Sequence, residues 1–250
     1  MTYGTTTRRR VSAWLLPILV GWAALTLSAA DWPQYQRDAS RGGYTPEELS
    51  TELSLLWSRQ ARHQPQPAWV GREFARSRMQ FDWAYSVVGA DGLVYFGSSA
   101  DHKVYALDAA TGAERWSAFT EGPVRLAPAI WQDRLFCISD DGYLHCFDRQ
   151  TGERKWRLRA GPSGEQLIGN GRMISRWAAR GGVAIEDGIV YFGAGNWPEE
   201  DVYIHAVDAA TGKVLWRNDN TGALEIDQPH MVCFSRGGVI AQGYLAVAGQ

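Results

Sequence analysis

Side chains suited to ligand binding occur in the loops of the second half of the sequence. Guanidinium groups form charge-assisted hydrogen bonds with anions, and indole rings stack on planar groups and cations. Together they could hold an anionic, planar ligand, although the simpler interpretation is that they pack and pin long loops. The candidates are Arg125, Asn170, Arg172, Arg176, Trp177, Trp197, Asp227 and His230.

Three aspartates, by contrast, are repeated along the chain. Each lies at the third position of an eleven-residue pattern, small-x-Asp-x-x-Thr-Gly-x-x-x-Trp. A single active site does not need three equivalent carboxylates, so we predict a structural role for each. The copies are Ala106, Asp108, Thr111, Gly112 and Trp116; Cys146, Asp148, Thr151, Gly152 and Trp156; and Ala206, Asp208, Thr211, Gly212 and Trp216.

The repeated pattern has a mechanical interpretation. The Asp side chain can accept backbone N–H groups of the turn that follows, and Gly can adopt the positive φ that such a turn requires. The small residue two positions before the Asp leaves room for the Trp ring. Burial of one indole per repeat contributes roughly 1.5–3 kcal/mol or more to stability.

The spacing of the repeats predicts a β-propeller. The aspartates are 40 and 60 positions apart, which fits a 40-residue unit with about 20 residues inserted once. Aromatic and β-branched runs between Gly and Asp turns indicate four strands in the first unit, at 85–90, 93–98, 103–108 and 113–119. Four antiparallel strands in such a unit are typical of a propeller blade.

We therefore predict an all-β chain whose blades form an open arc. Three blades are complete, at 83–119, 124–159 and 182–218, and a fourth begins at 235–250. The strand alternation brings the connections between blades to the same end as the hairpins between second and third strands. The candidate ligand residues lie at this end.

The first 82 residues have a different character. Arg8, Arg9 and Arg10 precede an apolar run, and small residues end it at position 30, as in a secretory signal peptide. An uncleaved anchor at 11–30 is the alternative, and either predicts a periplasmic, secreted or membrane-anchored protein. The polar segment 31–82 contains one predicted strand, 53–57, whose Trp matches the motif Trp and which would close the ring.

The motif resembles the tryptophan-docking motif of pyrroloquinoline-quinone-like, or quinoprotein-type, propeller repeats. That family includes quinoprotein alcohol dehydrogenases and the propeller lipoprotein of the outer-membrane barrel-assembly machinery. The resemblance covers about residues 83–250, and the Asp31-Trp32-Pro33-Gln34 run resembles the opening of many secreted bacterial members. Closed propellers typically have four to eight blades, so we expect this chain to be the N-terminal portion of a longer protein.

Histidines and cysteines give weaker signals. His145 and His205 occupy one repeat position, where the first blade has Tyr105, so we predict packing between blades and no metal site. Cys137 and Cys146 lie on adjacent strands of one hairpin. A two-residue turn would allow a disulfide, whereas a bulged turn would leave two buried thiols, which is the favoured interpretation.

Three functions are compatible with these features. The first is an exported, non-catalytic platform that binds a protein or a cell-surface polymer. The resemblance implies a second, a dehydrogenase that oxidises an alcohol or sugar with pyrroloquinoline quinone and calcium. Asp227 is a candidate base only because of its loop position, and the sequence lacks the adjacent cysteines of that family's enzymes. The third is a barrel-assembly scaffold, although no lipid-bearing Cys is indicated. The net charge of −2 and the lack of a basic stripe give no support for nucleic-acid binding, and the oligomeric state stays open.

Overall fold

The computed structural model describes residues 30–68, 84–169, 171–197, 200–219, 224–226, 235–237 and 243–248. These residues form strands, turns and extended segments, and they contain no α-helix. None of them therefore belongs to a helix with the length and hydrophobicity needed to span a bilayer. The predicted signal segment, 1–30, lies almost wholly outside the described residues.

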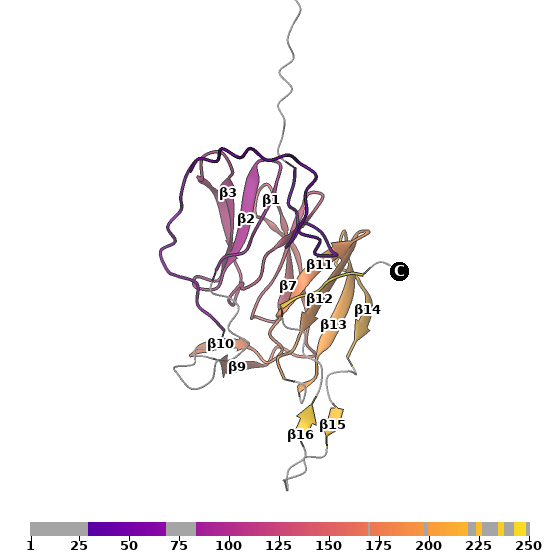
Figure 1. Cartoon of the computed structure of the whole chain (residues 1–250). Helices are drawn as coiled ribbons and strands as arrows, with labels where there is room; N and C mark the ends of the chain where they lie inside the picture. The colour runs from indigo at the N-terminus through magenta and orange to yellow at the C-terminus, as the bar shows by residue number, and fades with distance from the viewer. Residues whose placement is uncertain are drawn as a thin grey trace, which may run out of the picture.

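Three sheets, each containing four consecutive antiparallel strands, confirm the predicted blades (Figure 1). The inner strand β5 contacts both β1 and β11, and we call the region that these three inner strands line the hub. Blade one consists of β1 (Val87–Ala90), β2 (Leu93–Ser98), β3 (Lys103–Asp108) and β4 (Glu114–Phe119); blade two of β5 (Ala129–Trp131), β6 (Arg134–Ile138), β7 (Tyr143–Asp148) and β8 (Arg154–Arg159); blade three of β11 (Gly181–Glu186), β12 (Ile189–Ala194), β13 (Tyr203–Asp208) and β14 (Val214–Asn218).

The docking motif forms as its composition predicts. In blade one, the Oδ1 atom of Asp108 accepts the backbone N–H groups of Ala110 and Thr111 at 3.1 and 2.9 Å. Gly112 completes the turn with a φ of 71°, a conformation that residues with a Cβ atom rarely adopt. The Asp148 and Asp208 turns repeat these contacts.

The motif tryptophans of blades one and two each contact the following blade. The ring of Trp116 lies over Gly152 of blade two, where an added Cβ atom would approach it to 2.6 Å, and its Nε1 atom donates to the carbonyl of Arg149 at 3.0 Å. Trp156 covers Gly212 of blade three in the same way. Within its own blade, Trp116 pairs across the strands with the small Ala106. The glycine therefore supplies both the turn and the surface on which the neighbouring indole lies.

Trp57 repeats this contact from the N-terminal segment. Its ring lies over Gly112, and its Nε1 atom donates to the carbonyl of Ala109 at 2.8 Å. The strand predicted at 53–57 is nevertheless wrong, because these residues pair with no described strand and the side chains of Leu53, Leu55 and Leu56 are exposed. The tryptophan contact needs no β-ladder, since the ring and one indole N–H make it. Closure of the ring through this segment stays a prediction.

The Asp31-Trp32-Pro33-Gln34 run crosses the hub and touches all three inner strands. Trp32 exchanges two backbone hydrogen bonds with Gly89 of β1, and the carbonyl of Pro33 accepts the N–H of Ile130 in β5. The side-chain amide of Gln34 then bonds both the N–H and the carbonyl of Ile185 in β11, at 2.8 and 2.9 Å. The run thus ties three blades together at the end opposite the loops that connect them.

The C-terminal segment differs from the prediction of a fourth blade. Where it is described, β16 (Ser235–Gly237) pairs with β15 (Leu224–Ile226), and β17 (Gly243–Tyr244) pairs in parallel with β11. The Tyr244 ring stacks on Tyr35 with centroids 3.5 Å apart, and its hydroxyl accepts the N–H of Ala127. The sequence Gly-Tyr suits the second strand of a blade equally well, but the partly buried hub position gives the ring a stacking partner and the hydroxyl a hydrogen bond.

Cys137 and Cys146 are two buried free thiols, as the favoured interpretation predicted. The strand register places Cys137 opposite His145 and Cys146 opposite Phe136. Neighbouring positions of a strand pair point to opposite faces of the sheet, so the two sulfur atoms lie in different cores. This geometry excludes a disulfide between them.

We predict unequal losses of stability when two of the repeated tryptophans are truncated. Trp116 is 9% exposed, so Trp116→Ala should lower the free energy of unfolding by about 3–5 kcal/mol. Trp216, at 48% exposed, rests on no described glycine turn, and Trp216→Ala should cost less than half as much. Urea unfolding measures both, and equal losses would contradict docking between blades.

Candidate binding face

The loop-side face is the end of the blades that carries the connections between blades and the hairpins between second and third strands. Arg125, Arg176, Trp177 and Trp197 all lie in these loops. Sequence analysis also placed Asn170, Asp227 and His230 on this face, but these three lie outside the described residues.

A buried ion cluster occupies the centre of this face. Asp140 accepts from Arg125 Nε at 2.7 Å and from Arg180 Nε and Nη2 at 2.8 and 2.9 Å. Burial alone would raise the pKa of Asp140, but the charges of Arg180 and Arg125 outweigh it and the pKa is lowered. Because Asp140 belongs to blade two and its partners to the two connections flanking that blade, the cluster locks the loops together.

Arg125 therefore holds two loops together, which agrees with the simpler interpretation that these side chains stabilise loops. Its Nη1 atom also donates to the carbonyl of Gln66 at 2.6 Å, which fixes the N-terminal segment. Sequence analysis gave neither Arg180 nor Asp140 a role at this face. The signal for both was weak, since a buried ion pair between residues 40 positions apart leaves no local pattern.

Arg172 differs from the other two central arginines. Its Nη1 atom donates to the carbonyl of Ser99 at 2.9 Å and lies 2.8 Å from Nε2 of His102, both in blade one. Among the described residues it has no carboxylate within ion-pair distance. Burial first, and then the charge of Arg125, lower its pKa. The face thus holds more guanidinium groups than carboxylates at its centre.

Trp177 is a packing residue. Its ring lies against Gly161, its Nε1 atom donates to the carbonyl of Glu200 at 2.6 Å, and it meets Tyr203 edge-on. Arg176 covers this ring and pairs with the exposed Glu165 and with Glu200. By contrast, the Trp197 side chain is 39% exposed on the blade-three hairpin. Of the two candidate tryptophans, Trp197 is therefore the one whose indole solvent reaches.

The inserted residues between blades two and three form a hairpin of β9 (Gln166–Gly169) and β10 (Arg172–Ser175). It projects from the lower end of the molecule in Figure 1. Leu167 pairs with Ile174 and Ile168 with Met173. Ile174 is buried, whereas Ile168 and Met173 are 76% and 52% exposed. The hairpin thus presents an apolar cross-strand pair to solvent.

The repeated His and Tyr position fills the interior of the blades. His145 contacts Asp141 at 2.9 Å and stacks on Phe147, while His205 stacks on Phe192 with centroids 4.8 Å apart. Burial, and then the charge of Arg217, lower the pKa of His205 to about 4. Within the described ranges no group of three His, Cys, Asp or Glu side chains could hold a metal.

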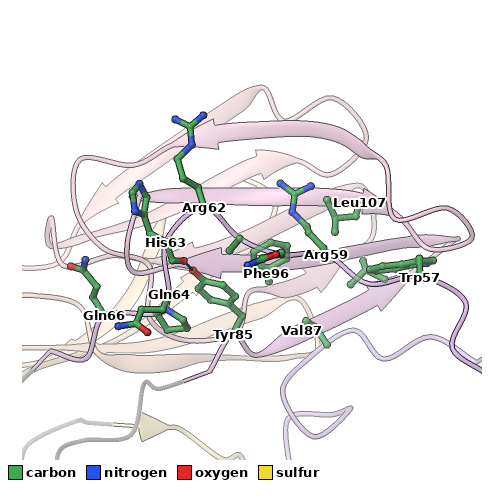
Figure 2. Close-up of a pocket in the computed structure, with 14 residues that line it drawn as sticks. Trp57, Arg59, Arg62, His63, Gln64, Gln66, Tyr85, Val87, Phe96 and Leu107 are labelled. Carbon is green, nitrogen blue, oxygen red and sulfur yellow. Dashed lines mark hydrogen bonds between the residues drawn. The ribbon is translucent and has the colours of Figure 1, made fainter.

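A groove of about 870 Å³ lies beside blade one, under the strap, which we define as residues 57–66 (Figure 2). Its floor includes Phe96, Leu107 and Val87, and its rim is cationic. Arg59 pairs with Glu114 at 2.8 Å, and the hydroxyl of Tyr85 donates to the strap at the carbonyl of His63. Figure 2 shows Arg59 and Arg62 pointing away from Tyr85 and Val87. This floor is the lateral face of a blade.

Comparison with known proteins gives consistent matches. A family model described as outer membrane protein assembly factor BamB matches residues 54–193. The dehydrogenase subunit of the quinone-dependent alcohol dehydrogenase of Gluconobacter oxydans is 28% identical over 207 residues, which cover 75% of this chain and 24% of that protein. The assembly factor BamB of Burkholderia pseudomallei is 27% identical over 106 residues, 42% of this chain and 22% of that protein.

A solved structure supports the fold. The quinohemoprotein alcohol dehydrogenase from Comamonas testosteroni superposes with a TM-score of 0.57 at 22% identity, over 76% of this chain and 27% of that one. The chain spans about a quarter of the length of the relatives that it matches.

We predict that the central ion cluster is essential for stability. Asp140→Asn removes the buried carboxylate that Arg125 and Arg180 share and should lower the free energy of unfolding by about 3–5 kcal/mol. Glu165→Gln, which breaks the exposed pair with Arg176, should cost no more than about 1 kcal/mol. Denaturant titration of both variants at pH 7 checks this, and a mild effect of Asp140→Asn would contradict it.

We predict an acid-dependent loss of stability from His205. Its pKa of about 4 in the folded protein lies below the ordinary value of 6.5, so the unfolded chain binds the proton more tightly and stability falls as pH drops from 6.5 to 4. The loss between pH 7 and pH 5 should be about 2 kcal/mol. His205→Tyr, which copies Tyr105 of blade one, should remove this part of the pH dependence. The measurement is the free energy of unfolding at pH 7 and pH 5, and an equal fall in the wild type and in His205→Tyr would refute the prediction.

Proposed function

Since the chain belongs to the pyrroloquinoline-quinone-like β-propeller repeat family, whose model carries the description outer membrane protein assembly factor BamB, we propose that it is an exported, non-catalytic platform that binds another protein. Export rests on the signal-like sequence of residues 1–30. The family hosts enzymes and assembly factors on one fold, so the argument for binding comes from the surface itself.

The observation that carries this proposal is the exposed pair Ile168 and Met173. Both are large apolar side chains, they lie side by side on β9 and β10, and solvent reaches most of Ile168. The hairpin is held to the body by Ile174 and by Arg172, so the pair is presented on a supported element. Apolar side chains gathered on a supported surface favour protein contact.

Other exposed apolar side chains have a different explanation. Val214, Leu215 and Trp216 lie on the outer strand of blade three, and Val87 lies in the groove beside blade one. Both places are lateral faces of blades, the kind of surface on which neighbouring blades pack. Ile168 and Met173 lie on the loop-side face, which no further blade would cover.

Site-specific photo-crosslinking tests the platform. A photoreactive residue at position 168 or 173 of the full chain, in the cells that produce it, should form a covalent adduct with one protein. The same residue at position 153, an exposed site at the opposite end of blade two, should not. Met173→Asp should abolish the adduct from position 168. Equal labelling from 153, or none from 168 and 173, would contradict the proposal.

A quinoprotein dehydrogenase is the second candidate function. The observation in its favour is Arg172, a partly buried guanidinium group with no described carboxylate partner, which could hold an anionic group of pyrroloquinoline quinone. That cofactor, bound with calcium, supplies the oxidising chemistry. A dye-reduction assay with an alcohol, the quinone and Ca²⁺ separates the candidates: turnover that depends on the quinone and falls in Arg172→Gln supports the enzyme and contradicts a non-catalytic role.

A further inference from the structure

The β9–β10 hairpin reaches from the connection between blades two and three to blade one. Its near end is built into blade two, where Ser175 donates its N–H to the carbonyl of Asp140 at 2.8 Å. Its far end meets blade one through Arg172, whose Nη1 atom contacts the carbonyl of Ser99 and Nε2 of His102. The two ends of the hairpin are therefore attached by different kinds of contact.

The contact between Arg172 and His102 requires a neutral imidazole. A guanidinium group has five N–H donors, carries no acceptor and stays protonated. At 2.8 Å, Nε2 of His102 must therefore offer its lone pair, and the ring proton must lie on Nδ1. If the ring gains a second proton, the acceptor is lost and two cations face each other at hydrogen-bonding distance.

The charges around His102 do not remove this conflict. Asp140 already holds Arg125 and Arg180, and Asp101 accepts the hydroxyl of Tyr105. Burial, then Arg172 and Arg125, lower the pKa of His102, while Asp140 and Asp101 act in the opposite direction without reversing the result. The ring is therefore protonated only at a pH below the ordinary pKa of histidine.

We propose that Arg172 and His102 form a proton-operated latch. The neutral ring holds the far end of the β9–β10 hairpin on blade one, and protonation of the ring releases it. Among the described residues, release leaves Arg172 with the Ser99 carbonyl alone, so β9 and β10 become mobile about their attachment to blade two. This mobility is a property of the fold and does not depend on whether Ile168 and Met173 bind a partner.

Amide hydrogen exchange of the full chain tests the latch. Once corrected for the chemical effect of pH, exchange in 166–175 should become at least about tenfold faster at a pH one unit below the pKa of the ring than at pH 7.5, since about nine latches in ten are then open and fewer than one in ten is open at pH 7.5. Amides of β6 and β7 should keep their protection. A His205→Tyr background removes the separate acid effect in blade three.

Variants at the two positions distinguish release of the hairpin from a general loss of protection against exchange. His102→Gln keeps an acceptor that does not titrate, so the hairpin should exchange slowly at both pH values. Arg172→Met should exchange fast at both. Because His102 has a φ of 56°, a conformation that Asn tolerates, His102→Asn is a second variant at this position: its shorter side chain does not reach Arg172, so the hairpin should exchange fast at both pH values. A wild-type hairpin with no pH response, a response that persists without His102, or slow exchange in Arg172→Met would each overturn the proposal.

Discussion

The contact of an indole with a glycine turn is the constraint on which this structure depends. Trp57, Trp116 and Trp156 each lie over the Thr-Gly turn of the following blade. A Cβ atom at Gly112, Gly152 or Gly212 would collide with the ring, and the positive φ of these turns already disfavours other residues. The Asp side chain holds the turn in shape, so one short motif sets both the end of a blade and its distance from the next.

Different kinds of interaction hold the blades together at their two ends. At one end, the Asp31-Trp32-Pro33-Gln34 run and the stacked Tyr35 and Tyr244 fill the hub with backbone hydrogen bonds and aromatic contacts. At the loop-side end, Asp140 gathers two arginines in a buried cluster. Charges buried in this way are costly unless they are paired, so the cluster makes the loop-side end sensitive to single substitutions and to protons. That end also carries the features that point to function.

The loop-side face connects the proposals on function. Arg125, Arg176 and Trp177 stabilise loops, and their stability allows β9 and β10 to present Ile168 and Met173. Arg172 links this hairpin to blade one through a histidine, so the supporting contact is also one that protonation can change. A binding platform and an enzyme of the same fold share the blades, so they differ in the residues that their loops carry.

Local sequence determined the blades: the Asp, Thr and Gly of each turn, the strand positions and the free thiols follow from contacts within about 11 residues or from strand alternation, whereas each docked Trp lies on the glycine turn of another blade. The tertiary structure decided the rest, because the deciding contacts join distant positions. Asp140 meets Arg180 from the next connection, Tyr244 enters the hub against Tyr35, and Trp57 lies on its glycine without a strand. Such pairings depend on how blades are placed side by side, and no local pattern of residues encodes that placement.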